Sequence, residues 1–184
     1  MASHKSQEVD VVLINPYPKD ASGINEATIE PPLGIGYIAA VLEYNNFSCK
    51  IIDANAIRLD NSQVCGIIKQ ESPKIVGIST NVVTSQAGME LSRMLKEGTN
   101  KPTVILGGPY PTAVPEETFK GSLCDAIVMG EGEETMLEIL KNYRERRPLF
   151  KETRGVMYQL NGKIVANPPR PLIQDLDSLP FPDF

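Results

Sequence analysis

Small and polar residues follow four apolar stretches of this 184-residue sequence, and their types suit them to ligand binding. These residues are Asn15-Pro16, Ser79-Thr80-Asn81, Gly107-Gly108-Pro109 and Gly130-Glu131-Gly132. A residue without a Cβ lets a ligand approach the backbone closely. A Gly-Gly pair is also typical of a tight turn that needs a positive φ, so two interpretations of Gly107-Gly108 stay open. Small residues after several of the stretches favour the binding interpretation.

Side chains that could carry out catalysis are sparse. The sequence has one histidine and three widely spaced cysteines, which are His4, Cys49, Cys65 and Cys124. They form no C-x-x-C pair and no cysteine–histidine or serine–histidine pairing, so we predict no catalytic residue and no metal site. Glu131, Glu133 and Glu134 could form a carboxylate cluster, but acids in a first helical turn commonly serve the helix dipole. We therefore expect a binding module rather than a complete catalyst.

Five apolar stretches alternate with five helical patterns, which predicts the elements that position these residues. The expected strands cover residues 9–16, 47–54, 73–80, 102–108 and 125–130. The expected helices cover residues 33–45, 60–70, 85–98, 114–120 and 131–147. Asp60 or Asn61 is the expected N-cap of the second helix, and Gly98 is expected to end the third in a C′-like position. Nearly all-apolar strands between helices predict an α/β fold with a doubly wound five-stranded parallel sheet, Rossmann-like and in flavodoxin-like order.

The strand ends should gather on one edge of this sheet. Ligands of open parallel sheets bind beyond the carboxyl ends of the strands. The connection from Asn15 to Pro32 is long, since a strand and the following helix are usually joined by about two to six residues. Connections of this length are typically functional or mobile, and a disordered insertion is the alternative.

The composition changes after residue 147. Residues 155–168 have the pattern of a hairpin around Asn161-Gly162. Six of the fifteen prolines follow position 147, which is typical of a linker, so we expect an N-terminal piece of a longer protein. The expected organisation is a polar leader over residues 1–8, a ligand-binding α/β domain over residues 9–147, and a hairpin and proline-rich linker over residues 148–184.

Composition and charge exclude several classes of partner. The net charge is −5 and no basic patch stands out, so we expect no nucleic acid partner. No apolar run reaches membrane-spanning length and no signal peptide is apparent, so we expect no membrane segment. An odd and sparse set of cysteines favours the reducing cytoplasm.

A dinucleotide-binding module is the alternative function. Residues 34–39, "GIGYIA", match G-x-G-x-x-A, and Asp53 ends the next strand, where a ribose-binding acid would stand. That fingerprint needs its glycines directly after the first strand, whereas Gly34 follows Asn15 by 19 residues. Helix packing also explains Gly34 and Gly36. A phosphate-accepting receiver domain is excluded because Ser79 stands where an aspartate would be required.

Four longer segments occur in a characteristic order, and a fifth closes the chain. They are "EPPLGIGYIAAVLE", "VGIST", "VILGGPYPT" and "DAIVMGEGEET", followed by "LIQDLDSLPFPDF". Over about residues 9–184, this set resembles the N-terminal cobalamin-binding domain of cobalamin-dependent radical SAM enzymes. The resemblance implies a cobalamin over the C-terminal edge of the sheet, with its nucleotide tail between strands and helices.

The resemblance also implies a set of cofactor-binding residues. Gly107-Gly108 would let the tail pass, Ser79 and Thr80 would offer hydroxyl groups, and Pro109-Tyr110-Pro111 would hold a loop clear of the tail. Gly130 to Gly132 would flank the tail, and Pro32 to Gly34 would lie near the corrin. The complete set is Pro16, Pro32, Leu33, Gly34, Ser79, Thr80, Asn81, Gly107, Gly108, Pro109, Tyr110, Gly130, Glu131 and Gly132.

Two departures from related proteins limit what this chain is expected to do. Other cobalamin domains carry D-x-H-x-x-G, whose histidine ligates cobalt, but residues 15–36 contain no histidine and the lower ligand stays unknown. The chain also lacks the C-x-x-x-C-x-x-C motif that holds an iron–sulfur cluster. S-adenosylmethionine and that cluster would bind only in a downstream radical SAM domain absent from this chain. We therefore expect a domain that holds cobalamin, as a methyl carrier, for a methyltransferase or cyclase.

Overall fold

The computed structural model describes residues 9–18, 30–98 and 101–182. The expected leader over residues 1–8, with His4, lies outside the described residues. The same is true of residues 19–29, which make up most of the long connection after the first strand.

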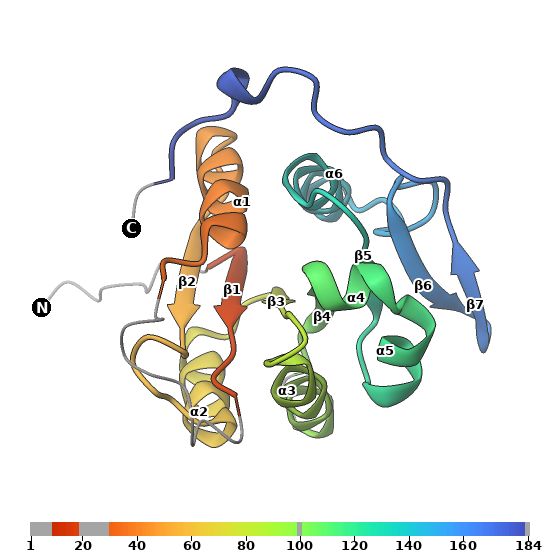
Figure 1. Ribbon diagram of the computed structural model, residues 1–184. Coiled ribbons are helices and arrows are strands. Elements are labelled where there is room, and N and C mark those ends of the chain that lie inside the picture. Colours follow the sequence, from red (N-terminus) through yellow and green to blue (C-terminus); the bar gives the residue numbers. More distant parts are fainter. Residues whose placement is uncertain (1–8, 19–29, 99–100, 183–184) are drawn as a thin grey trace, which may run out of the picture.

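One seven-stranded sheet, in the order β2-β1-β3-β4-β5-β6-β7, forms the centre of the fold (Figure 1). Its parallel strands are β1 (Val11–Asn15), β2 (Cys49–Asp53), β3 (Ile75–Ser79), β4 (Thr103–Gly107) and β5 (Ala126–Val128). Two antiparallel strands follow, β6 (Val156–Leu160) and β7 (Lys163–Ala166). The predicted parallel sheet in flavodoxin-like order is confirmed, with two more strands than expected.

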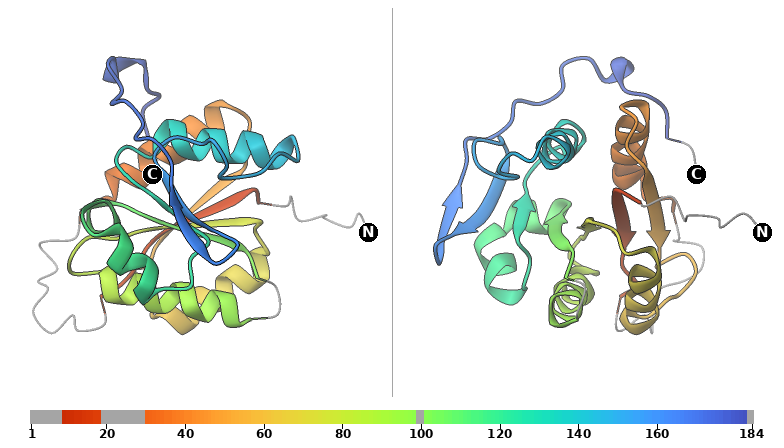
Figure 2. Two further views of the ribbon diagram at one scale, coloured as in Figure 1. Left: turned by 90° about the vertical axis from the view of Figure 1, so that its right-hand side faces the viewer. Right: turned by 180° about the vertical axis from the view of Figure 1, so that it is seen from behind.

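Helices cover both faces of the sheet, as a doubly wound fold requires (Figures 1 and 2). One face carries α1 (Leu33–Tyr44) and α6 (Glu133–Arg144). The other face carries α2 (Asn61–Glu71), α3 (Ser85–Glu97) and α5 (Pro115–Gly121). Two short helices lie at the rim and near the C-terminus, α4 (Pro109–Ala113) and the 3₁₀ helix η2 (Leu176–Ser178).

Alternate residues of each strand enter two separate hydrophobic cores. In β1, Val11 and Leu13 join the core beneath α1 and α6, whereas Val12 and Ile14 join the core beneath α2 and α3. Successive side chains of a strand point to opposite faces, so a sheet that is covered twice needs apolar residues at nearly every position. This requirement explains the continuous apolar stretches in the sequence.

The C-terminal hairpin belongs to the sheet rather than forming an appendage. Asn161 and Gly162 have φ values of 51° and 78°, as a tight two-residue hairpin turn requires, so the predicted turn is confirmed. Val156, Met157 and Tyr158 are buried and pair with β5. The hairpin therefore covers an edge of β5 that would otherwise be open.

Helix ends agree with the expectation at Asp60, one of the two predicted N-caps, and differ from it at Gly98 and Pro109. Asp60 is the N-cap of α2: its carboxylate accepts a hydrogen bond from Gln63 N at 2.8 Å, and Gln63 Oε1 accepts one from Asp60 N at 2.9 Å. Gly98 ends α3, but in an extended conformation (φ −68°, ψ 174°) rather than the left-handed one typical of C′ glycines. The expected proline-locked loop is wrong, because Pro109 begins α4, and proline suits the first position of a helix.

Candidate cofactor-binding site

A cavity of about 480 Å³ lies on the α1–α6 face of the sheet and reaches the C-terminal ends of β3, β4 and β5. Its walls are Gly34, Ile35 and Ile38 of α1, and Glu133 and Met136 of α6. Its floor and rim come from the strands and the turns that follow them. The floor and rim residues are Leu13, Gly77, Ile78, Ser79, Ile105, Gly107, Gly108, Pro109, Thr112, Val128, Gly130, Glu131 and Gly132.

Missing side chains on the floor create this space. In the strand register, Gly77 of β3 is aligned with Leu13 of β1 on one side and with Ile105 of β4 on the other. Two residues further along β3, Ser79 is aligned with Gly107 of β4. A Cβ added to Gly77 would lie 2.8 Å from Cδ2 of Leu13. The sequence interpretation missed Gly77, although a glycine within the apolar stretch "VGIS" is a recognised sign of a close approach.

The two glycines of the Gly107-Gly108 pair have different roles. Gly107 has no positive φ, and an added Cβ would lie 3.5 Å from Val128 O, which is an ordinary contact. Gly108 has φ +94° and ψ −175°, a region essentially restricted to glycine, and its added Cβ would lie 2.7 Å from Thr80 O. The backbone therefore requires glycine at Gly108 but not at Gly107, whose missing side chain leaves room in the cavity.

The rim next to α6 is also built around glycine. Gly130 has φ +78°, and its N–H donates to Oγ1 of Thr112 at 3.0 Å. Gly132 is buried, and an added Cβ would lie 2.7 Å from Cδ1 of Ile38. Gly132 thus lets the start of α6 pack closely against α1 and closes that side of the cavity.

The carboxylates of the cavity lie in different surroundings. Oε2 of Glu131 accepts a hydrogen bond from Ile173 N at 2.7 Å. Oε2 of Glu133 is buried and has no hydrogen-bond partner among the described residues. Burial raises the pKa of Glu133, and the charges of Glu131 and Glu134 raise it further, whereas the backbone N–H groups of Gly132 and Glu133 lower it.

The cavity brings together many of the residues predicted from the sequence. It is lined by Gly34, Ser79, Gly107, Gly108, Pro109, Gly130, Glu131 and Gly132. Residues that the prediction missed include Gly77 and Ile38, and also Thr112, Glu133 and Met136. The predicted residues that do not line it are Pro16, Pro32, Leu33, Thr80, Asn81 and Tyr110.

Local hydrogen bonding and packing account for the polar residues outside the cavity. Thr80 is buried, and its methyl group lies against Gly88 of α3, on the other face of the sheet. The side chain of Asn81 accepts hydrogen bonds from Val83 N and Thr84 N at 2.9 and 3.1 Å. Thr80 follows Ser79, the last residue of β3, and does not line the cavity, so a contact between its hydroxyl group and the nucleotide tail stays a prediction.

Tyr110 and the prolines also lie away from the cavity. The hydroxyl group of Tyr110 donates to Oε1 of Glu117 at 3.2 Å. Burial raises the pKa of the phenol, and the charge and hydrogen bond of Glu117 raise it further. Pro16 is buried just after β1, and Pro32 is the N-cap of α1. Leu33 is 57% exposed at the start of α1.

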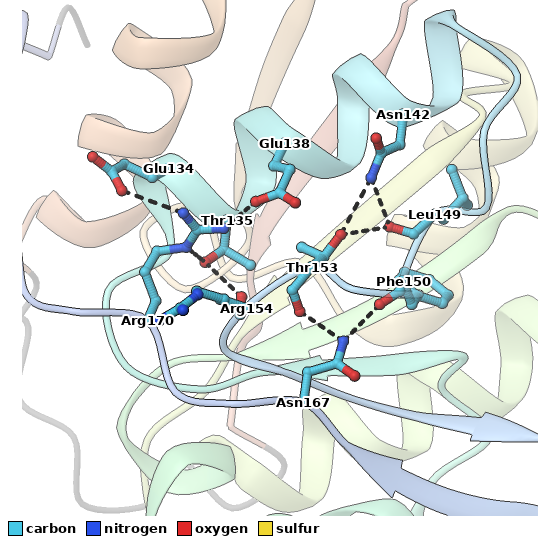
Figure 3. Close-up of polar contacts among 10 residues, drawn as sticks. All are labelled: Glu134, Thr135, Glu138, Asn142, Leu149, Phe150, Thr153, Arg154, Asn167 and Arg170. Carbon is cyan, nitrogen blue, oxygen red and sulfur yellow. Dashed lines mark hydrogen bonds and ion pairs between the residues drawn. The ribbon is translucent and has the colours of Figure 1, made fainter.

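The segment after β7 is anchored to α6 (Figures 1 and 3). Helix α6 forms one wall of the cavity. Nε of Arg170 donates to Oγ1 of Thr135 at 2.8 Å, and its guanidinium pairs with Glu134 and Glu138. Nδ2 of Asn167 donates to the carbonyl groups of Phe150 and Thr153 at 2.7 Å each. The proline-rich segment, expected to be a linker, is thus held at the rim by Arg170 and by the Glu131–Ile173 hydrogen bond.

The two features of the alternative dinucleotide site, the glycines of residues 34–39 and Asp53, do not line one cavity. Oδ1 of Asp53 accepts hydrogen bonds from Nδ2 of Asn15 at 2.9 Å and from Ala56 N at 3.2 Å, and Asp53 does not line the cavity. Gly36 is buried in α1, as the packing explanation requires. The geometry therefore gives the alternative no support.

The described part of the chain offers neither a metal-binding cluster nor a membrane-spanning helix. Residues 9–18, 30–98 and 101–182 contain no group of three or more His, Cys, Asp or Glu side chains that could hold a metal ion. Cys49, Cys65 and Cys124 are free thiols. No helix in these ranges is long and apolar enough to cross a membrane.

Known proteins resemble this chain in sequence and in fold. Residues 22–140 match the B12 binding domain family. An uncharacterized methyltransferase of Pyrococcus horikoshii is 35% identical over 95% of this chain and 38% of its own length. The anaerobic magnesium-protoporphyrin IX monomethyl ester cyclase of Rubrivivax gelatinosus is 30% identical over 81% of this chain and 28% of its own length. The chain thus spans well under half of these relatives.

A solved structure has the same fold. The cobalamin-dependent S-adenosylmethionine radical enzyme OxsB, with aqua-cobalamin and S-adenosylmethionine bound, superposes with a TM-score of 0.74 at 18% identity. The match covers 90% of this chain and 23% of OxsB. The family match extends from the long connection before α1 into α6 and so includes both helices that wall the cavity. The chain therefore belongs to the B12-binding domain family, whose ligand is cobalamin.

Proposed function

We propose that the cavity between α1 and α6 receives the nucleotide tail of cobalamin, while the corrin lies over the C-terminal ends of the strands. The observation that carries this proposal is the cavity of about 480 Å³ above Gly77 and Gly107. Ligand pockets typically enclose about 300–1,000 Å³ between mostly apolar walls with few polar groups. Aliphatic side chains and glycines make up most of this lining, which suits the flat ring system of the tail.

Residues of the cavity would hold the tail through packing and a few polar contacts. Gly77 and Gly107 would allow the tail to lie directly on the sheet, between Ile38 of α1 and Met136 of α6. Ser79 places its hydroxyl at the same edge, next to Gly107 in the register. Pro16, Pro32 and Leu33 lie outside the cavity, at strand- or helix-end positions where the corrin would be expected.

Cobalamin, when bound, supplies a cobalt centre that can carry a methyl group. The chain's sole histidine is His4, so we propose that no histidine of this chain ligates the cobalt. Electron paramagnetic resonance of the cob(II)alamin complex tests this point. Superhyperfine coupling to an imidazole nitrogen of the protein would overturn it.

We further propose that residues 9–147 and the segment after them are the cobalamin-binding part of a longer radical SAM enzyme. Relatives at 35% and 30% identity are named a methyltransferase and a cyclase, and both extend far beyond the match. S-adenosylmethionine and an iron–sulfur cluster would bind in that further part. Free cysteines agree with a cytoplasmic location.

A titration with one matched control tests the proposed site. Gly107→Ala adds a methyl group to the cavity at a position that the backbone tolerates. Gly66→Ala adds the same group on the exposed side of α2, where no atom lies within 4 Å of the new Cβ. A side chain added to a packed contact costs about 1–3 kcal/mol, or roughly a tenfold to hundredfold loss of affinity.

Aquacobalamin is titrated into the wild type and both variants, with absorbance as the readout. We expect saturable binding by the wild type and by Gly66→Ala, and weaker binding by Gly107→Ala. Absence of wild-type binding would refute cobalamin binding by this chain. Equal affinity of all three proteins would place the ligand elsewhere.

A further inference from the structure

One carboxylate oxygen of the cavity lacks a hydrogen-bond partner in the part of the chain that the structure describes. Oε2 of Glu133 is buried and unbonded among the described residues, whereas Oε2 of Glu131 is occupied by Ile173 N. Buried polar atoms of native proteins nearly always have hydrogen-bond partners, and an unsatisfied one is costly. The unpaired oxygen of Glu133 therefore needs an explanation, and a ligand in the cavity would supply one.

Capping of α6 explains only part of the surroundings of Glu133: the backbone N–H groups of Gly132 and Glu133 interact with its carboxylate, yet Oε2 stays buried without a hydrogen bond from the described residues. Glu134 stands in the same first turn, is exposed, and can interact with the helix dipole from the surface. Glu134 and Glu138 also pair with Arg170, and no described Lys or Arg side chain forms an ion pair with Glu133. If Glu133 served only the helix dipole, its carboxylate could remain in solvent, as that of Glu134 does. Glu133 instead lines the cavity.

The charged groups around Glu133 restrict what can bind there. Glu131 and Glu134 lie nearby, while α1 and the strands contribute no charged side chain to the lining. An ionised carboxylate accepts hydrogen bonds only, so a phosphate or carbonyl oxygen of a ligand would be repelled. A neutral N–H or O–H donor is the complementary group.

We propose that Glu133 is a specificity-determining residue that accepts a hydrogen bond from an N–H or O–H group of bound cobalamin. This inference rests on the proposed function. Two parts of cobalamin offer such donors, the ribose hydroxyl of the nucleotide tail and the carboxamide groups of the corrin. A ligand without a donor at this place leaves the carboxylate buried and unpaired, so Glu133 discriminates against it.

The test compares Glu133→Ala and Glu133→Gln with Glu134→Gln as the control in the same helical turn. Hydrogen bonds to charged groups are the stronger class, so Glu133→Ala should weaken aquacobalamin binding by about 10-fold to 100-fold. Glu133→Gln keeps an acceptor oxygen but loses the charge and should lie between Glu133→Ala and the wild type. Glu134→Gln should bind as the wild type does.

Two further readouts separate recognition from a structural role. In the wild type, affinity should fall as the pH is lowered through the pKa of Glu133, and this part of the pH profile should be absent from Glu133→Gln. Without ligand, Glu133→Gln should melt no lower than the wild type, because the replacement removes an unpaired buried charge. A lower melting temperature with unchanged affinity would overturn the inference.

Cobinamide, which lacks the nucleotide tail, identifies the donor. A penalty for Glu133→Ala that persists with cobinamide assigns the donor to a corrin carboxamide, and one that vanishes assigns it to the ribose. Equal aquacobalamin affinity of wild type, Glu133→Ala and Glu133→Gln would refute the inference while leaving the proposed function intact. Failure of the wild type itself to bind would instead refute the proposed function.

Discussion

The two faces of the sheet are built from the same strands but are filled differently. Toward α2 and α3, β3 and β4 present Val76, Ile78, Val104 and Leu106, all buried side chains that fill the core. Toward α1 and α6, alternate positions of the same strands include Gly77 and Gly107, and a cavity of about 480 Å³ lies above them. The comparison indicates that the face toward α2 and α3 is filled throughout, whereas on the other face glycines that leave space alternate with core residues such as Ile75 and Ile105.

Leaving this space has an energetic cost. Burying an aliphatic side chain contributes about 1.5–3 kcal/mol, and a glycine within a strand forgoes that contribution. Glycine also costs about 0.5–1 kcal/mol relative to alanine through its larger loss of backbone entropy. A cavity floored by Gly77 and Gly107 is therefore better explained by ligand binding than by folding.

The largest expected effect on stability lies on the filled face. Leu106 is fully buried toward α2 and α3, so Leu106→Ala should lower the free energy of unfolding by about 2–5 kcal/mol. The cobalamin affinity of the remaining folded protein should stay unchanged, because the deleted atoms lie across the sheet from the cavity. Urea unfolding and a titration in the cold measure the two quantities. A marked loss of affinity would show that the two faces are coupled.

Substitution of Gly108 should reduce stability, as substitution on the filled face does, although Gly108 lies at the rim of the cavity. Its φ of +94° and the approach of an added Cβ to Thr80 O penalise any side chain. Gly108→Ala should therefore lower the free energy of unfolding by about 1–3 kcal/mol. Thermal melts of Gly108→Ala and Gly107→Ala compare the two neighbours. Equal melting temperatures would contradict the separate roles assigned to them.

Gly77 provides the opposite case, with a larger effect on binding than on stability. The Cβ of Gly77→Ala would press on Cδ2 of Leu13, the end of a flexible side chain that can move into the cavity. Stability should change by less than about 1 kcal/mol, while cobalamin affinity falls roughly tenfold. Titration and melting of Gly77→Ala beside Gly66→Ala measure both. Loss of stability with unchanged affinity would mean that the ligand does not lie over Gly77.

The alternation of elements in the sequence predicted the parallel part of the fold. Each apolar stretch and helical pattern carries its own local signal, and the alternation of strands with helices predicts parallel pairing in one sheet. The pairing of β6 with β5 could not be predicted in this way, because it joins Ala126 to Tyr158 across a helix and a turn. Whether a hairpin extends a sheet depends on a free edge that only the folded domain has.

The residues that line the cavity were predicted in part, for reasons that differ between residues. Strand ends gather at one edge by topology alone, which placed Ser79, Gly107 and Gly130 correctly at the cavity. Thr80 follows the last residue of β3 and does not line the cavity; its methyl group lies against Gly88 of α3. The contribution of Ile38 and Met136 depends on how α1 and α6 pack, which no local pattern specifies.

The smallest expected effect concerns the pH dependence of stability without ligand, and it belongs to the cavity face. Burial and neighbouring acids raise the pKa of Glu133 in the folded state, so the folded protein holds this proton more tightly than the unfolded chain, whose glutamates titrate near about 4.3. Stability from this group is therefore fully present below the unfolded pKa and is lost as the pH rises through the folded pKa. Glu133→Gln cannot lose a proton. The difference in melting temperature between Glu133→Gln and the wild type should therefore grow as the pH rises from the unfolded to the folded pKa, and should stay constant above it. Glu134→Gln, on the exposed side of the same turn, should not show this rise. If the difference between Glu133→Gln and the wild type is independent of pH, the carboxylate of Glu133 is solvated, and its orientation into the cavity is wrong.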